Sequence, residues 1–222
     1  MNAQESPVEK QTKDLLYQAL ETEMGGVEVY RTALLCARRD ELKEEWARFL
    51  GQTERHVAIV REVFDRLGLD PQATTPGRQI VRDKARGLVS AMQRALKDAP
   101  QSAQIVAAES VVDAETKDRS NWELLAALSG KATGDARTAL VDACEQVAQE
   151  EDEHLSSARA WSRRLWFDAI GVDGSAKEDA VSSAEETAEE PIEEKRRPPR
   201  RAAAARIARP RKLKVVRRGR ER

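Results

Sequence analysis

Residues 147–158 read VAQEEDEHLSSA. Four residues of this stretch recur at intervals of four, three and four positions, which is the period of one face of an α-helix: Val147, Glu151, His154 and Ala158. A carboxylate and an imidazole therefore lie about one turn apart on a face that should be apolar. This Glu-x-x-His spacing suits two ligands of one metal ion.

The same helical period recurs in three other long stretches before residue 170. The patterns run from Leu16 to Ala37, from Trp46 to Leu67 and from Ile105 to Leu125. A shorter helical pattern, around Ile80–Leu96, lies between the second and the third. Four long amphipathic helices can bury one shared core, and the shorter helix lengthens the connection enough to cross over. The sequence therefore predicts an all-α fold, a four-helix bundle with an extra short helix in the long crossover.

Gly25 and Gly26 interrupt the first of these patterns. Each glycine costs about 1 kcal/mol relative to alanine inside a helix, so the pair needs a structural reason. Two reasons are open: another backbone approaches this helix closely, or the helix is locally distorted.

Ionisable residues occupy core positions in all four long patterns. Glu23, Glu115 and Glu151 stand where leucine is expected, and the two histidines of the chain, His56 and His154, fall on the second and fourth stripes. A buried carboxylate is unfavourable unless it is paired, protonated or bound to a metal. Carboxylates combined with imidazoles suit iron or manganese, and no nearby cysteine indicates a structural zinc site. We therefore predict that these five residues bind two Fe or Mn ions, with a single ion or none as the alternatives.

Three stretches carry a resemblance to known families. LETEMGGVEVYRTAL at residues 20–34 and VAQEEDEHL at residues 147–155 resemble the metal-binding helices of bacterioferritins and rubrerythrin-type proteins. FLGQTERHVAIVREVFDRLGLDP at residues 49–71 is similar to the YciE/YciF-type ferritin-like stress proteins. The resemblance covers residues 10–168.

The resemblance implies a ferritin-like four-helix bundle within residues 1–172, in which Glu23, Glu151 and His154 bind the metals. It also implies a link to iron or oxidative-stress handling with O₂ or peroxide as reactant. An enzyme of this kind would be a weak ferroxidase or a peroxide-reducing oxidoreductase. The alternative is a non-catalytic bundle, a scaffold or interaction protein with a degenerate metal site, because fold alone does not fix the reaction.

The second helix departs from the family pattern. The position three residues before His56 holds Thr53 where bacterioferritins have a glutamate, so a bridging carboxylate is missing. Gln52 or Glu54 would have to replace it, but Glu54 lies about 200° around the helix from His56. On the third long helix, Asp118 is a candidate for a further carboxylate. We therefore expect an asymmetric site.

Simpler interpretations of these residues are also open. A lone histidine on a helix stripe is often an ordinary core residue. Glu115 would face solvent if its helix were rotated by one position, and Glu150, Asp152 and Glu153 would form a solvated face. Tyr30 is a candidate accessory residue of the site, but packing with a hydrogen-bonded hydroxyl also fits it.

The near-neutral charge of the chain conceals two opposed blocks. The sequence has 38 Lys+Arg and 39 Asp+Glu, but residues 195–222 hold 14 basic residues and one acid, which leaves 24 basic against 38 acidic residues in 1–194. Residues 173–194 are predicted to form an acidic disordered linker and residues 195–222 a basic disordered tail. The tail is expected to bind polyanions such as nucleic acid. An anionic membrane surface and the acidic part of the chain itself are the alternatives.

Composition narrows the class of protein further. Two cysteines, Cys36 and Cys144, do not make a disulfide scaffold and favour a reducing compartment. No apolar run approaches the ~20 residues that cross a bilayer, and residues 1–10 lack an apolar signal core. We therefore expect a cytoplasmic protein without a transmembrane span, with a homodimer as an open alternative.

Deletion of residues 195–222 tests the interpretation of the tail. We expect the truncated protein to lose DNA retention that the full chain shows at low salt and loses at high salt, because counterion release drives such binding. Retention on a DNA column over a salt gradient measures this. Equal retention of both proteins would show that the tail does not bind nucleic acid.

Overall fold

The computed structural model describes residues 7–173, which form five α-helices and no β-strand. Their bounds are α1 Pro7–Cys36, α2 Asp40–Leu67, α3 Pro76–Asp98, α4 Ala103–Ser129 and α5 Gly134–Ile170. The all-α prediction is confirmed, and α3 is the shorter helix expected between the second and third long ones. The predicted linker and tail lie outside the described residues, apart from residue 173. Among the described helices, none combines the length and the apolar character that a membrane span requires.

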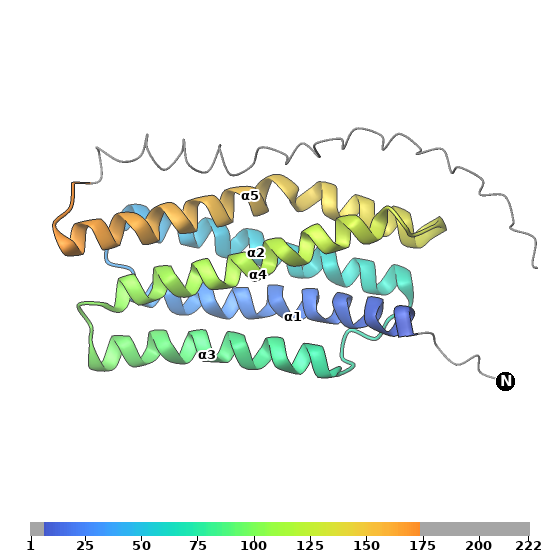
Figure 1. The fold of residues 1–222 in the computed structure, drawn as a ribbon, viewed down its shortest axis with the longest axis horizontal. Helices are drawn as coiled ribbons and strands as arrows, with labels where there is room; N and C mark the ends of the chain where they lie inside the picture. The colour runs from blue at the N-terminus through green and yellow to red at the C-terminus, as the bar shows by residue number, and fades with distance from the viewer. Residues whose placement is uncertain (1–6, 174–222) are drawn as a thin grey trace, which may run out of the picture. The chain divides into compact units, whose positions relative to one another are not determined.

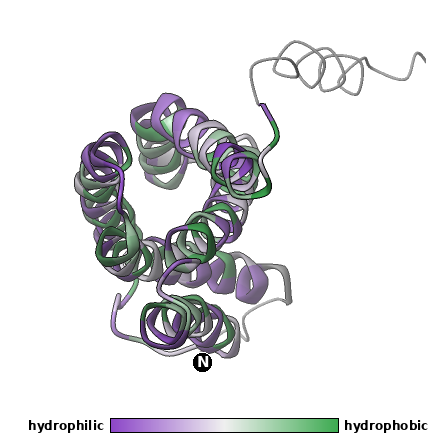
Figure 2. Ribbon diagram, turned by 90° about the vertical axis from the view of Figure 1, so that its left-hand side faces the viewer, coloured by the Kyte–Doolittle hydropathy of each residue, from purple (hydrophilic) through white to green (hydrophobic). Residues whose placement is uncertain are grey.

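Four of the described helices pack around one another, and α3 lies outside them (Figure 1). α1 packs against α2 and α4, and α5 packs against the same two helices, so α1 and α5 face each other without close backbone contact. α3 packs only against α1 and α4, and the end-on view in Figure 2 shows one helix outside the ring of the other four. Because α3 runs back along the length of the other helices, it forms the crossover between α2 and α4 (Figure 1).

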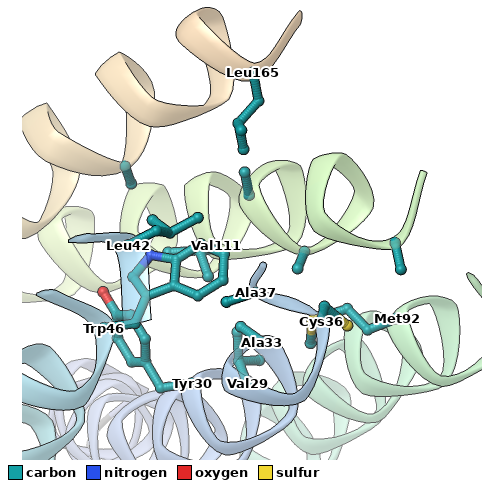
Figure 3. Close-up of a cluster of buried hydrophobic side chains, with 14 of the residues drawn as sticks. Val29, Tyr30, Ala33, Cys36, Ala37, Leu42, Trp46, Met92, Val111 and Leu165 are labelled. Atoms are coloured by element: carbon teal, nitrogen blue, oxygen red, sulfur yellow. The ribbon is translucent and has the colours of Figure 1, made fainter. Parts of the chain in front are cut away.

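Two clusters of buried apolar side chains fill the space between these helices. One includes Tyr30, Trp46 and Phe49, and the other includes Leu20 and Phe64. Figure 3 shows the first cluster, to which Tyr30 of α1 and Trp46 of α2 both belong. On each of α1, α2, α4 and α5 the two clusters are separated by a short polar interval. These intervals hold the residues of the predicted metal site.

The helix ends follow local sequence signals. α2 ends at Leu67, before Gly68, whose φ of 64° is left-handed. The Gly68 N–H then donates to the Asp65 carbonyl oxygen and the Leu69 N–H donates to that of Phe64. α3 begins after Thr75, whose side chain accepts a hydrogen bond from the Arg78 N–H, and Pro76 occupies the first helical position. These signals fix where α2 ends and where α3 begins. They therefore help to determine which residues of the two helices lie beside α1.

A buried charge cluster joins α3 to α1. Glu21 on α1 accepts hydrogen bonds from Arg78 at 2.7 Å and from Arg82 at 2.6 Å. The Arg78 side chain is only 4% exposed and also donates to the carbonyl oxygens of Pro71 and Ala73. Because both arginines come from α3 and its preceding loop is held as well, this cluster fixes where the crossover helix lies on the bundle.

The Gly25–Gly26 pair marks close helix contacts rather than a break, since α1 is continuous through it. A Cβ atom built on Gly25 would lie 2.7 Å from the Cβ of Ala85 on α3, and one on Gly26 would lie 3.2 Å from Cγ2 of Thr53 on α2. The interpretation as close approach is confirmed, and the alternative of a distorted helix is wrong. The two glycines let α1 contact α3 on one side and α2 on the other.

The substitution Gly25→Ala tests this contact. We expect it to lower the free energy of unfolding by about 1–3 kcal/mol, because its Cβ overlaps a rigid Cβ on α3. The matched control is Gly51→Ala on α2, where nothing lies within 4 Å of the added Cβ; it should raise stability by up to about 1 kcal/mol. Urea unfolding measures both. A Gly25→Ala protein as stable as Gly51→Ala would contradict the close approach.

Candidate metal centre

Three buried residues from three helices form the centre of the candidate site. Glu23 of α1, His56 of α2 and Glu151 of α5 each offer one ligand atom, and these atoms all lie within 4.8 Å of one another. His56 Nδ1 is 2.9 Å from Glu151 Oε1 and 3.7 Å from Glu23 Oε1. The polar intervals of the helix stripes therefore meet at one point.

A second group lies beside the first and shares Glu151 with it. Nδ1 of His154 is 3.5 Å from Glu115 Oε2 and 3.9 Å from Glu151 Oε1. The rings of His56 and His154 are stacked, with centroids 5.7 Å apart and an interplanar angle of 27°. Glu151 thus stands between the two imidazoles, next to Glu23 on one side and Glu115 on the other.

The outer nitrogen of each histidine is held by an acceptor outside these groups. Nε2 of His56 lies 2.8 Å from Glu150 Oε2, and Nε2 of His154 lies 3.0 Å from Gln52 Oε1. With the amide of Gln52 assigned this way, both Nε2 atoms carry the proton and donate it. The two Nδ1 atoms then face the carboxylates. Metal-binding histidines typically have this arrangement, with one nitrogen on the metal and the other donating to an outer acceptor.

The carboxylate oxygens at the centre lack hydrogen-bond partners. They are Glu23 Oε2, Glu115 Oε2, Asp118 Oδ1 and both oxygens of Glu151. His56 Nδ1 also lacks a bond of acceptable geometry, despite its 2.9 Å approach to Glu151. Buried polar groups are nearly always satisfied, so this concentration of unpaired acceptors is unusual. A cation coordinated by these oxygens and by the two Nδ1 atoms would satisfy them, so the donor set fits iron or manganese.

Burial and neighbouring charges shift the pKa values of Glu23, Asp118 and His56. Burial, with the charge of Glu151, raises the pKa of Glu23, although His56 opposes the rise. Burial, with Glu23 and Glu151, raises the pKa of Asp118 well above its usual range. Burial alone would lower the pKa of His56, but contacts with Glu151 and other carboxylates raise it to about 9. Without a metal, protons must take the place of a cation here.

The structure brings together all five residues that the sequence selects as ligands, and it leaves one accessory candidate out. Glu115 is only 3% exposed, so the interpretation of Glu115 as a solvent-facing residue is wrong. Glu54 points away, and its half-exposed carboxylate binds Arg31 at 2.8 Å. The position of Glu54 therefore does not support a role as accessory ligand. Thr53 is buried, and its hydroxyl donates to the carbonyl oxygen of Phe49.

The other two accessory candidates are buried at the site. Asp118 lies one turn beyond Glu115 and interacts with Glu23 and Glu151. The Tyr30 ring packs edge-on against His154, with centroids 6.3 Å apart. The Tyr30 hydroxyl has no aligned hydrogen-bond partner among the described residues, and burial together with Glu115 raises its pKa. Tyr30 is thus part of the wall of the site, close to the second group.

Sequence reasoning missed two residues that hold the ligands. The Trp122 indole N–H donates to Glu23 Oε1 at 2.8 Å and fixes that carboxylate. Glu150, interpreted from sequence as part of a solvated face, reaches His56 and also bonds to Arg55. Its only sequence signal is its place beside Glu151, and for Trp122 there is none beyond its apolar stripe. Side-chain reach from a neighbouring helix face, rather than helical period, places both.

Comparison of the chain with models of protein families, with curated proteins and with solved structures gave no match.

The substitution Asp118→Asn tests the electrostatic state of the metal-free centre. Because its pKa is raised, Asp118 in the folded protein must either hold a proton or carry its charge at a cost in free energy that the unfolded chain does not meet. Asparagine removes this requirement and keeps a donor, so we expect the free energy of unfolding at pH 7 to rise by about 2 kcal/mol. Near pH 4, where the unfolded aspartate is protonated too, the gain should disappear.

Urea unfolding in the presence of a chelator measures this effect. The control is Asp113→Asn, an exposed position on the same helix, which should stay within about 0.5 kcal/mol of the wild type. A gain in the free energy of unfolding that is the same at both pH values, or no gain at pH 7, would show that the surroundings of Asp118 do not raise its pKa.

Proposed function

We propose that the described helices form a ferritin-like bundle that binds two non-haem metal ions, iron or manganese. The observation that carries this proposal is the set of unpaired carboxylate oxygens facing two histidine Nδ1 atoms in the buried centre. Buried ionised groups of one sign are strongly unfavourable unless a counter-charge accompanies them. A divalent cation supplies that counter-charge and accepts the free lone pairs at the same time.

The ligands divide into two positions that share one carboxylate. Glu23 and His56 would hold one ion, Glu115 and His154 the other, and Glu151 lies between them. The first position has three ligand atoms close together already. Trp122 also holds Glu23 there. We therefore propose that the first position binds metal more tightly than the second.

The residues around the ligands keep the centre rigid and dry. Glu150 and Gln52 orient the two imidazoles, and the apolar clusters on either side exclude water. Bound iron would supply electron-transfer chemistry with O₂ or peroxide. The protein would then act as a weak ferroxidase or peroxide-reducing oxidoreductase in iron or oxidative-stress handling, and the basic tail would bring it to a polyanion such as DNA.

The second candidate function is a non-catalytic scaffold. Thr53 favours it, because a neutral side chain stands where a bridging carboxylate would complete the set. In that case the same bundle would bind metal weakly or not at all, and the tail would carry the function. Metal binding separates the two candidates.

We expect chelator-treated wild-type protein to bind Mn(II) in calorimetry. Protein loaded with Fe(II) without oxygen should show an absorbance change when O₂ is admitted. His154→Ala should abolish that absorbance change, because it removes a ligand of the second position, while Mn(II) binding at the first position persists. Glu151→Ala removes the shared carboxylate and should weaken both positions by at least tenfold.

The matched control is Glu145→Ala, an exposed glutamate on α5 that contacts none of the ligands. It should behave as the wild type in both measurements. Wild-type protein that neither binds Mn(II) nor responds to O₂ after Fe(II) addition would overturn the metal proposal and support the scaffold.

A further inference from the structure

A cavity of about 410 Å³ lies between α1, α3 and α4, on the side of α1 and α4 that faces the crossover helix. Its wall is apolar over most of its extent, formed by Val29, Val81, Ala85, Leu88 and Ala114. The cavity is within the size range of sites for small organic ligands. It is separate from the metal centre, because none of the predicted ligands lines it.

Two lysines from different helices share the wall of this cavity. Lys84 comes from α3 and Lys117 from α4, and their charges repel each other. Lys117 Nζ donates to Asn121 Oδ1 at 2.6 Å, and within residues 7–173 neither lysine forms an ion pair with a carboxylate. Asp113 also lines the cavity, so the charged groups of the wall sum to one net positive charge. An anionic group between the two amines would balance it.

Gly87 contributes an exposed edge to the cavity. Gly87 lies in the middle of α3 and lines the cavity, although glycine costs about 1 kcal/mol relative to alanine in a helix. A Cβ built on Gly87 meets nothing within 4 Å, unlike that on Gly25. Close helix packing therefore does not require this glycine. A larger residue here would add bulk at the edge of the cavity without clashing with a neighbouring helix.

We propose that this cavity binds an aliphatic carboxylate, with its chain along the apolar wall and its carboxylate between Lys84 and Lys117. A small inorganic anion is a poorer match, because such an anion would leave most of the apolar wall without contacts. An uncharged aliphatic molecule would leave the two amines without a counter-charge. The inference does not depend on the metal centre, which lies on the other face of the α1 and α4 backbones.

Calorimetric titration of the full, chelator-treated chain with decanoate tests the proposal. We expect saturable binding at one site per chain. The double variant Lys84→Gln, Lys117→Gln should weaken decanoate binding at least tenfold, while glutamine still donates to Asn121. Gly87→Leu should weaken decanoate binding, because it adds a side chain at the exposed edge of the cavity without a backbone clash. Circular dichroism and thermal unfolding show that each variant folds.

Matched controls separate the cavity from the basic residues elsewhere in the chain. Gly51→Leu adds the same side chain at an exposed position of α2 that lines no part of the cavity, and it should bind decanoate as the wild type does. Acetate should not bind measurably, and decanol should bind at least tenfold more weakly than decanoate. The proposal is overturned if decanoate does not bind, if folded Gly87→Leu binds it unchanged, or if decanol binds as tightly.

Discussion

Unpaired carboxylates at the centre of the helices are the constraint on which the rest of the structure depends. Glu23, Glu115 and Glu151 converge from three helices on one buried region, where four of their oxygens lack hydrogen-bond partners: Glu23 Oε2, Glu115 Oε2 and both oxygens of Glu151. Such an arrangement persists only if other interactions hold the helices in place. The two apolar clusters do this, one on each side of the polar interval. The Glu21–Arg78 cluster adds a fixed position for α3. The buried carboxylates lower the free energy of unfolding when no cation is present. The apolar clusters and the Glu21–Arg78 cluster therefore have to supply the stability that holds the centre together.

Much of the site is predictable from helical period alone, because a ligand on a core stripe must point inward once the helix packs. His56 and His154 are found in this way, since both stand on stripes that are otherwise apolar. Helical period does not identify the residues that support the ligands. Glu150 and Gln52 lie beside the apolar stripes, and only their long side chains bring them to the histidines. The contact of Arg78 with Glu21 joins residues 57 positions apart, and no local pattern indicates such a pairing.

The helix number and the crossover were likewise predictable, since long amphipathic patterns and their glycine and proline boundaries specify them. Which helix each glycine of α1 contacts could not be predicted from the sequence. Gly25 and Gly26 are adjacent in sequence, but one meets Ala85 on α3 and the other meets Thr53 on α2. Only the angle of about 100° between successive helical residues separates these two faces. One dipeptide thus sets two interhelical distances, and with them the space available both at the buried polar centre and beside α3.

Thr53 and Gly26 together explain why the buried carboxylates are arranged asymmetrically, with none from α2. The Cβ position of Gly26 is 3.2 Å from Thr53 Cγ2, so α1 and α2 are in close contact where a bridging glutamate would start. A longer side chain at residue 53 would have to pass this contact or push the helices apart. With the close approach kept, acceptors for the imidazoles come from other positions, Glu150 on α5 and Gln52 on α2. Both bind the outer nitrogens, so they orient the rings without adding a carboxylate between the two histidines. The asymmetry is therefore a consequence of helix packing and not of the ligand helices alone.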